Sequence, residues 1–225
     1  MSLTLYYHPL ASYCHKALVA LYELGSPFDK RLIDLSQPAD RDELQAVWPL
    51  RKFPVLRDTG RNQMVPEASI IIEYLDLHYP GAEKLLPSSA ADALAVRQWD
   101  RVFDLHVQGP MQDIVNDRLF ERHGDMQPAR EALSAAYGII DAQLASGTAW
   151  ICGEQFSLAD CAAAPALFYA STLQAFGQEE HHLRRYFDRL MDRPSVAQVL
   201  SEARPYFHFY PFHDRIPQRF LSERT

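Results

Sequence analysis

The stretch Phe53-Pro54-Val55-Leu56-Arg57, followed by Asp58-Thr59-Gly60-Arg61-Asn62, decides the fold of the first part of the chain. The first five residues are mostly apolar and carry a proline near their start, which is typical of a short strand. The next five form turns, so residues 63–65 are predicted to fold back as the second strand of a hairpin. Residues 68–79 then have apolar positions at helical spacing and stop at Pro80-Gly81, which predicts a helix.

In the segment before this hairpin, predicted strands alternate with predicted helices. Residues 3–7 and 28–35 are predicted strands, because both are rich in β-branched, aromatic or aliphatic side chains. Between them, residues 14–24 have helical periodicity and end at Gly25. Residues 41–47 are a predicted short helix. The order β-α-β-α-β-β-α indicates an α+β domain in which helices cover a small mixed sheet.

The chain changes character after about residue 83. Residues 84–90 contain proline and serine and are predicted to link two domains, which places the first domain at 1–83 and the second at 91–225. The second domain has helical patterns throughout and is predicted to be all-α. Gly109-Pro110 is expected to bend its first helix. The predicted helices are 91–122, 128–145, 157–174, 179–191 and 195–203.

Two features of the second domain stand out. Ser157-Leu158-Ala159-Asp160 places a serine at a predicted helix start with an acid three residues later, which is a capping-box pattern. The segment 205–212 is dense in tyrosine and phenylalanine but contains prolines. It either packs on the core or covers a ligand pocket.

Composition excludes several classes of protein. The 225 residues carry a net charge of −7, without the basic footprint of a nucleic-acid-binding protein. The longest nearly apolar run, 161–170, is far shorter than the ~20 residues of a membrane span. Three cysteines and no signal-peptide pattern indicate a reducing, cytoplasmic setting. The nine histidines form no ligand pattern, so no metal site is expected.

Four segments, taken in order, resemble the cytosolic glutathione S-transferases: 6–12 together with Lys16, 51–56, 66–75 and 156–160. The resemblance covers nearly the whole chain. It implies a thioredoxin-like N-terminal domain followed by an all-α C-terminal domain, and a homodimer. It also implies an enzyme that uses glutathione as cosubstrate and activates its thiol for attack on a small hydrophobic electrophile.

The resemblance leaves the thiol-activating residue open. Ser12 matches the serine of the theta and zeta classes, where a hydroxyl at a helix start stabilises the thiolate. Tyr6 and Tyr7 are alternatives from other classes, although strand packing explains them better. Cys14 is the second alternative, because omega- and beta-like members form a mixed disulfide through a cysteine. Cys152 is expected to lie in the core, as is Cys161.

The remaining glutathione contacts are carried over position by position. Pro54 matches the family's cis-proline, which presents the backbone of Phe53 to the cysteinyl unit, and Lys52 faces the glycine carboxylate, with Arg41 as a weaker candidate. Glu67 matches the acid that faces the γ-glutamyl ammonium group.

The chain departs from the family at two positions. Ala68 stands where the usual serine supplies a hydroxyl, with Ser69 as an uncertain replacement, and Arg51 stands where the family has glycine. Two other functions therefore stay open: a non-catalytic binding or regulatory protein with this fold, and a glutathione-dependent thiol reductase that uses Cys14.

Overall fold

The computed structural model describes residues 3–222 and divides into two compact units, Met1–Leu86 and Pro87–Thr225. Residues 1–2 and 223–225, the outer ends of the two predicted domains, lie outside the described residues.

The first unit is a four-stranded mixed sheet with three helices, which confirms the predicted thioredoxin-like fold. The sheet has the strand order β2-β1-β3-β4, with β1 parallel to β2 and antiparallel to β3, and β3 antiparallel to β4. Its elements are β1 (Leu3–Tyr7), α1 (Ser12–Glu23), β2 (Asp29–Leu32), α2 (Pro38–Val47), β3 (Val55–Asp58), β4 (Gln63–Pro66) and α3 (Ala68–His78).

Several element boundaries differ from the prediction. Helix α2 begins at Pro38 rather than at residue 41. Helix α1 begins two residues earlier, at Ser12, because the N–H groups of Cys14 and His15 both donate to the Ala11 carbonyl. Strand β3 begins at Val55, after the proline that has no N–H to donate to a ladder. Strand β2 is four residues long rather than eight.

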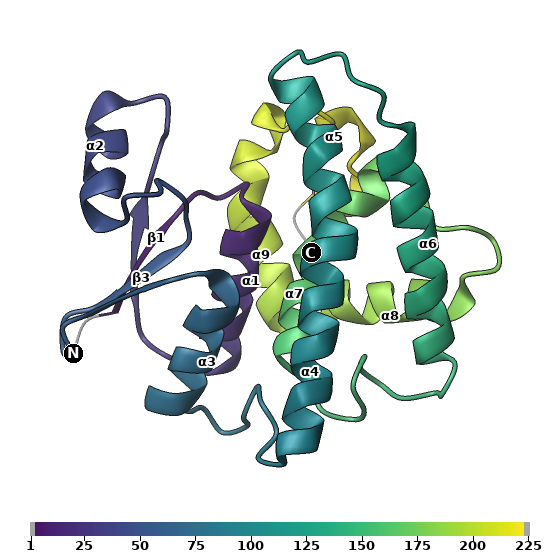
Figure 1. Cartoon of the computed structure of the whole chain (residues 1–225), viewed down its shortest axis with the longest axis horizontal. Helices are drawn as coiled ribbons and strands as arrows, with labels where there is room; N and C mark the ends of the chain where they lie inside the picture. The colour runs from purple at the N-terminus through teal and green to yellow at the C-terminus, as the bar shows by residue number, and fades with distance from the viewer. Residues whose placement is uncertain (1–2, 223–225) are drawn as a thin grey trace. The chain divides into compact units, whose positions relative to one another are not determined.

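Both faces of this sheet are covered. Figure 1 shows α1 and α3 side by side on one face and α2 on the other. On the α2 face, Leu44 packs in a buried cluster with Tyr6, Ile33 and Val55. Leu5 and Leu56, which are opposite each other in the β1–β3 register, are completely buried. Because successive side chains of a strand point to opposite faces, the apolar residues of the sheet pack partly against α2 and partly against α1 and α3.

A buried carboxylate ties the hairpin to α3. Asp58, at the end of β3, accepts hydrogen bonds from the Tyr74 hydroxyl (2.8 Å), the Tyr79 hydroxyl and the Arg61 N–H (3.0 Å). Burial alone raises the pKa of Asp58, but these hydrogen bonds outweigh it and the net pKa is lowered. Asp58 is therefore a charged group that fastens the strand end.

The second unit is all-helical, as predicted, but its first expected helix is divided into three segments. A π-helical turn separates α4 from α5, because the Gly109 N–H donates back to the Asp104 carbonyl just before Pro110, which cannot donate. The elements are α4 (Ala90–Val102), the π-turn (Phe103–Gln108), α5 (Gly109–Leu119), α6 (Gln127–Leu144), α7 (Leu158–Leu173), α8 (His181–Asp192), α9 (Pro194–Ala203) and 3-10 turns at Arg204–Phe209, His213–Arg215 and Gln218–Phe220.

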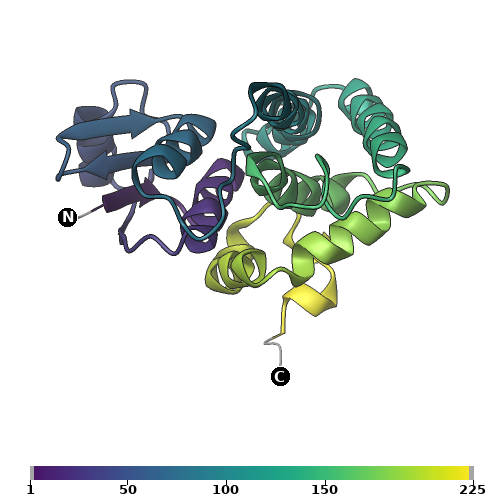
Figure 2. The same cartoon turned by 90° about the horizontal axis from the view of Figure 1, so that it is seen from below.

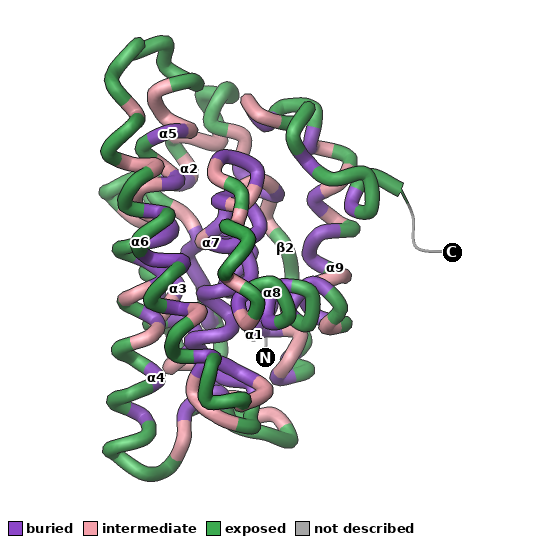
Figure 3. Tube along the Cα trace, turned by 90° about the vertical axis from the view of Figure 1, so that its right-hand side faces the viewer, coloured by how far each residue is buried: buried purple, intermediate pink, exposed green. Residues whose placement is uncertain are grey.

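Helix α7 is the centre of this unit. It contacts α4, the π-turn, α5 and α8. Figure 2 shows it in mid-green, surrounded by the other helices of this unit. Nearly all of it is buried (Figure 3). The aromatic tail packs against the same helix: Phe207 stacks on Phe168, and the Tyr210 hydroxyl lies 2.8 Å from the Thr172 hydroxyl. Of the two readings of the tail, the structure favours packing on the core for Phe207 and Tyr210.

The predicted capping box is present at the start of α7. The completely buried Asp160 accepts hydrogen bonds from the Ser157 N–H (2.9 Å) and hydroxyl (2.8 Å). It also accepts from the Ile151 N–H (3.1 Å) and the Tyr186 hydroxyl (2.6 Å). This carboxylate therefore joins the α7 start to the preceding loop and to α8.

Within residues 3–222, no helix is both long enough and apolar enough to cross a lipid bilayer.

We expect Ser157→Ala to lower the free energy of unfolding by about 1 kcal/mol, because it removes one hydrogen bond from the buried Asp160. In a chain of this size that is a fall of roughly 2–4 °C in Tm, measurable by thermal unfolding. Ser171→Ala in the same helix is the control, since the Ser171 hydroxyl donates to the Phe168 carbonyl of its own helix. Equal effects of the two substitutions would contradict the assignment.

Candidate functional site

The register of the sheet brings three loops together at one edge. Val55, the first residue of β3, pairs with Tyr6 near the end of β1 and with Pro66 at the end of β4. Because both pairings are antiparallel, β1 and β4 end where β3 begins. The loop before α1, the Phe53-Pro54 segment and the start of α3 therefore meet at the same edge.

The first of these segments carries Ser12 at the start of α1. Ser12 is the first helical residue rather than the residue before the helix, and it is buried. The N–H groups of Ser12 and Tyr13 precede the first intrahelical hydrogen bonds, which Cys14 and His15 donate to Ala11. A hydroxyl at this positive end of the helix dipole is well placed to stabilise an anion such as a thiolate.

Cys14, two residues further on, has a different environment. Its side chain is completely buried, and burial raises the pKa of the thiol, against the opposing effect of a backbone hydrogen bond with His8. A thiol that stays protonated at neutral pH is a poor nucleophile. Burial therefore opposes a role for Cys14 as a nucleophile.

The other two cysteines lie in the helical unit. Cys161 is buried there, as expected. Cys152 is only half-buried rather than fully in the core, and burial raises its pKa to about 12. All three cysteines are free thiols.

The second segment contains a cis peptide bond between Phe53 and Pro54, as the resemblance implies. The His8 ring stacks on the Phe53 ring, with centroids 6.0 Å apart and planes 18° apart. The Leu10 N–H donates to His8 Nδ1 (3.2 Å), which places the remaining imidazole proton on Nε2. Burial lowers the pKa of His8, although Asp34 opposes the shift, so the ring is neutral at pH 7. The sequence did not predict the stacking of His8 on Phe53, because the two residues lie in loops that are far apart in the chain.

The third segment is the start of α3. Glu67 is exposed and has φ 70°, a left-handed conformation that is costly for any residue but glycine. The Ile71 N–H donates to the Glu67 carbonyl (2.8 Å), so the N–H groups of Ala68 and Ser69 precede the first helical bond. Ala68 is buried and carries no hydroxyl, as the sequence shows. Strain at an exposed acid beside a helix N-terminus is typical of a binding site.

Ser69 faces a buried cation. Its hydroxyl accepts a hydrogen bond from the ammonium group of Lys16 (2.8 Å), and Lys16 is 1% exposed. A lysine is rarely buried without a polar partner. Lys16 therefore places a positive charge under the start of α3, a role that its position within the apolar α1 could have indicated.

The remaining candidates lie around the Phe53 loop. Lys52 is exposed. Arg51, at the position where the resemblance expects glycine, has φ 52°, which explains why glycine suits that position. Arg41 bonds the carbonyls of Leu35 and Ser36, so its guanidinium is held by its own loop.

No group of three or more His, Cys, Asp or Glu side chains among residues 3–222 is arranged to hold a metal ion.

Comparison with known proteins identifies the family. The model for the glutathione S-transferase N-terminal domain matches residues 5–83, and the model for the C-terminal domain matches residues 104–194. The chain belongs to the glutathione S-transferase family. Glutathione is the cosubstrate of this family.

Curated relatives are distant. The chain is 25% identical over 191 residues to glutathione S-transferase GstB of Escherichia coli K12, covering 82% of this chain and 91% of the relative. It is 28% identical over 217 residues to FtsZ-localized protein A of Caulobacter vibrioides, covering 90% and 92%.

Solved structures agree on the fold. A delta-class glutathione transferase of Nilaparvata lugens superposes with a TM-score of 0.81 at 19% identity, covering 96% of this chain and all of that one. A glutathione S-transferase of Methylobacillus flagellatus, solved with glutathione bound, has a TM-score of 0.72 at 24% identity, covering 88% and 98%.

We expect Cys14 to resist alkylation in the native protein, because burial holds the pKa of its thiol far above the ordinary value. Iodoacetamide labelling followed by peptide mass spectrometry should show negligible modification of Cys14 from pH 7 to pH 9. In denaturant, where the pKa returns to ~8.5, labelling should rise with pH. Rapid native labelling of Cys14 at pH 7 would restore it as a nucleophile.

Proposed function

We propose that the first unit binds reduced glutathione and that Ser12 stabilises its thiolate for attack on a small hydrophobic electrophile. The observation that carries the proposal is the meeting of the α1 start, the Phe53-Pro54 segment and the α3 start at one sheet edge. Such an edge offers a helix N-terminus for the sulfur, a strand-like backbone for the cysteinyl unit and a second helix N-terminus for a carboxylate.

The ligand groups are assigned by charge. Glu67 is exposed at the start of α3 and pairs with the γ-glutamyl ammonium group, while the first N–H groups of α3 and the Lys16 charge receive the γ-glutamyl carboxylate. Phe53 presents its backbone to the cysteinyl unit, and the exposed Lys52 pairs with the glycine carboxylate. Ala68 donates only its N–H, and the missing hydroxyl costs about 1.5–3 kcal/mol. Glutathione binding is therefore weak.

In the reaction, the Ser12 hydroxyl donates a hydrogen bond to the glutathione sulfur and favours its anionic form. The thiolate electron pair forms a carbon–sulfur bond with the electrophilic carbon, and the leaving group departs with the electrons of the bond that breaks. The protein forms no covalent bond with the substrate, so the low reactivity expected of Cys14 is compatible with catalysis.

A second candidate is a binding protein that does not catalyse conjugation. Ala68 favours it, because a weakened glutathione site loses affinity without losing the fold. Relatives at similar identity include the stringent starvation protein A homolog of Haemophilus influenzae, 27% identical over 201 residues and covering 86% of this chain and 87% of the relative. Glutathione binding without turnover of any electrophile would favour this candidate.

We expect Ser12→Ala to raise the pKa of the bound glutathione thiol by about one unit or more, because a hydrogen bond to a charged group is lost. Conjugation of a chlorodinitrobenzene-type electrophile should fall about tenfold or more in kcat/KM at neutral pH. Calorimetric titration with glutathione should change little. The thiol pKa is read from the pH dependence of conjugation and of thiolate absorbance.

Cys14→Ala is the control for this prediction and should retain the wild-type thiol pKa. If Cys14→Ala lost all activity while Ser12→Ala kept it, the result would support the alternative function, a glutathione-dependent thiol reductase that uses Cys14. No binding of glutathione to the wild type would overturn the proposed function as a whole.

We also propose a homodimer. Helix α3 exposes Ile70 and Leu77, seven residues apart on one face, and the α4 to π-turn segment exposes Leu94 and Leu105. The exposed fractions, 53–73%, are large for aliphatic side chains, which is typical of surfaces that a second copy covers. The free thiols support a cytoplasmic location.

Light scattering should give twice 25.7 kDa for the wild type. Leu77→Glu combined with Leu94→Glu should shift the mass toward 25.7 kDa, since buried charges oppose association. Leu119→Glu on α5, an exposed leucine on a different helix, is the matched control. A monomeric wild type would contradict the dimer.

A further inference from the structure

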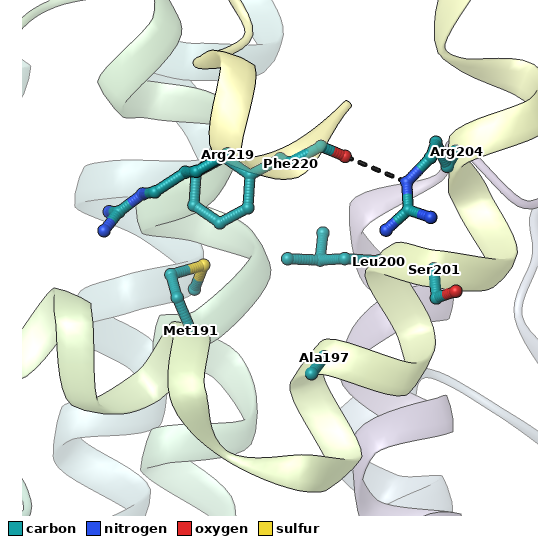
Figure 4. A pocket seen from close by; sticks show the side chains of 7 residues that line it. All are labelled: Met191, Ala197, Leu200, Ser201, Arg204, Arg219 and Phe220. Atoms are coloured by element: carbon teal, nitrogen blue, oxygen red, sulfur yellow. Dashed lines mark hydrogen bonds between the residues drawn. The ribbon is translucent and has the colours of Figure 1, made fainter. Parts of the chain in front are cut away.

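The helical unit contains a half-open cavity of about 320 Å³ that the proposed glutathione site does not use (Figure 4). It lies between the end of α8, one face of α9 and the C-terminal 3-10 turns. Its lining residues are Met191, Ala197, Leu200, Ser201, Arg204, Arg219 and Phe220. The volume is at the small end of the range for small-molecule sites, ~300–1,000 Å³.

One stripe of α9 builds a wall of this cavity. Ala197, Leu200, Ser201 and Arg204 follow the i, i+3, i+4, i+7 spacing, so they share a helix face. The floor is apolar, since Met191, Leu200 and Phe220 are all at least 95% buried. A ligand here would contact an apolar surface on one side and a polar edge on the other.

The two arginines that line the cavity differ in their partners. Arg219 donates to the Asp188 carboxylate (2.8 Å), and its guanidinium lies 4.7 Å from the centre of the Phe220 ring. In Figure 4 its guanidinium extends away from Leu200. Asp188 therefore offsets the charge of Arg219.

Arg204 is held differently. Its Nε donates to the Phe220 carbonyl (3.1 Å), which fixes the side chain against the tail while its two terminal amino groups lie on the Leu200 and Ser201 side (Figure 4). Among residues 3–222, no carboxylate forms an ion pair with Arg204, and no residue hydrogen bonds the Ser201 hydroxyl. A fixed cation and a hydroxyl thus flank the apolar floor.

We propose that this cavity binds a small monocarboxylate with an apolar body. The carboxylate is held by the two terminal amino groups of Arg204, a bidentate pairing that guanidinium geometry favours, and by the Ser201 hydroxyl. The apolar body covers Met191, Leu200 and Phe220 and is removed from water there. The site lies wholly within the second unit and is independent of the proposed glutathione function.

The test is fluorescence or calorimetric titration of the full-length protein with 2-naphthoate, with 2-naphthalenemethanol as the uncharged analogue of matched size. The wild type should bind one equivalent of 2-naphthoate and bind the alcohol more weakly. Octanoate in place of 2-naphthoate distinguishes an aliphatic from an aromatic body, while the carboxylate requirement is common to both.

Arg204→Gln should weaken 2-naphthoate binding about tenfold or more and leave the alcohol unaffected, because only the charged contact is lost. Arg185→Gln, an exposed arginine of α8 outside the cavity, is the matched control and should bind as the wild type does. Glutathione titration should be the same in all three proteins.

Ser201→Leu is the second variant, since Ser201 is exposed and the larger side chain fills the cavity without altering charge. It should abolish binding of both the acid and the alcohol, even if Arg204→Gln fails to fold. Equal affinity of the wild type for acid and alcohol, undiminished binding in Ser201→Leu, or no binding at millimolar 2-naphthoate would each overturn the proposal.

Discussion

The pairing of β3 with both β1 and β4 is the constraint on which the first unit depends. The β1–β3 pair buries Leu5 and Leu56 completely. A slip of β3 by one residue would turn Leu56 to the opposite face of the sheet from Leu5, so the register is strongly specified. Asp58 reinforces this register at the far end of β3. Its carboxylate accepts hydrogen bonds from the hydroxyl of Tyr74 in α3 and from that of Tyr79, the residue after α3. The register thereby fixes where β3 begins relative to the ends of β1 and β4. The three loops of the candidate site meet at this point.

The two candidates for the residue that activates the glutathione thiol differ in their environment. Ser12 and Cys14 lie in the same turn of α1, and both could assist a sulfur reaction by composition alone. Ser12 stands among the helix-start N–H groups, where negative charge is favoured. Cys14 points into the core, and burial raises the pKa of its thiol. In the proposed function, the start of this helix stabilises the glutathione thiolate, while burial keeps the Cys14 thiol of the same helix protonated.

The second unit uses one buried carboxylate as its organising polar group. Asp160 accepts four hydrogen bonds, from Ser157 twice, Ile151 and Tyr186, and so joins the α7 start to its own loop and to α8. Burial raises the pKa of Asp160, and the four hydrogen bonds oppose that shift and satisfy the buried carboxyl group. Around α7 the aromatic tail packs on Phe168 and Thr172, and the Arg204 cavity lies where the same tail meets α9.

The sequence alone determined the order of elements, because apolar periodicity and turn residues are local signals. It also predicted the cap at Ser157 and Asp160, whose spacing of three residues is set within one helical turn. It did not predict the π-helical turn at Phe103–Gln108, because Gly109-Pro110 indicates a bend without specifying how the backbone absorbs it. Only the tertiary structure decided that Cys14 is buried, that Lys16 holds Ser69, that His8 stacks on Phe53 and that Arg204 faces an apolar floor. Each of these depends on what packs against a side chain, and its partners lie far away in the sequence.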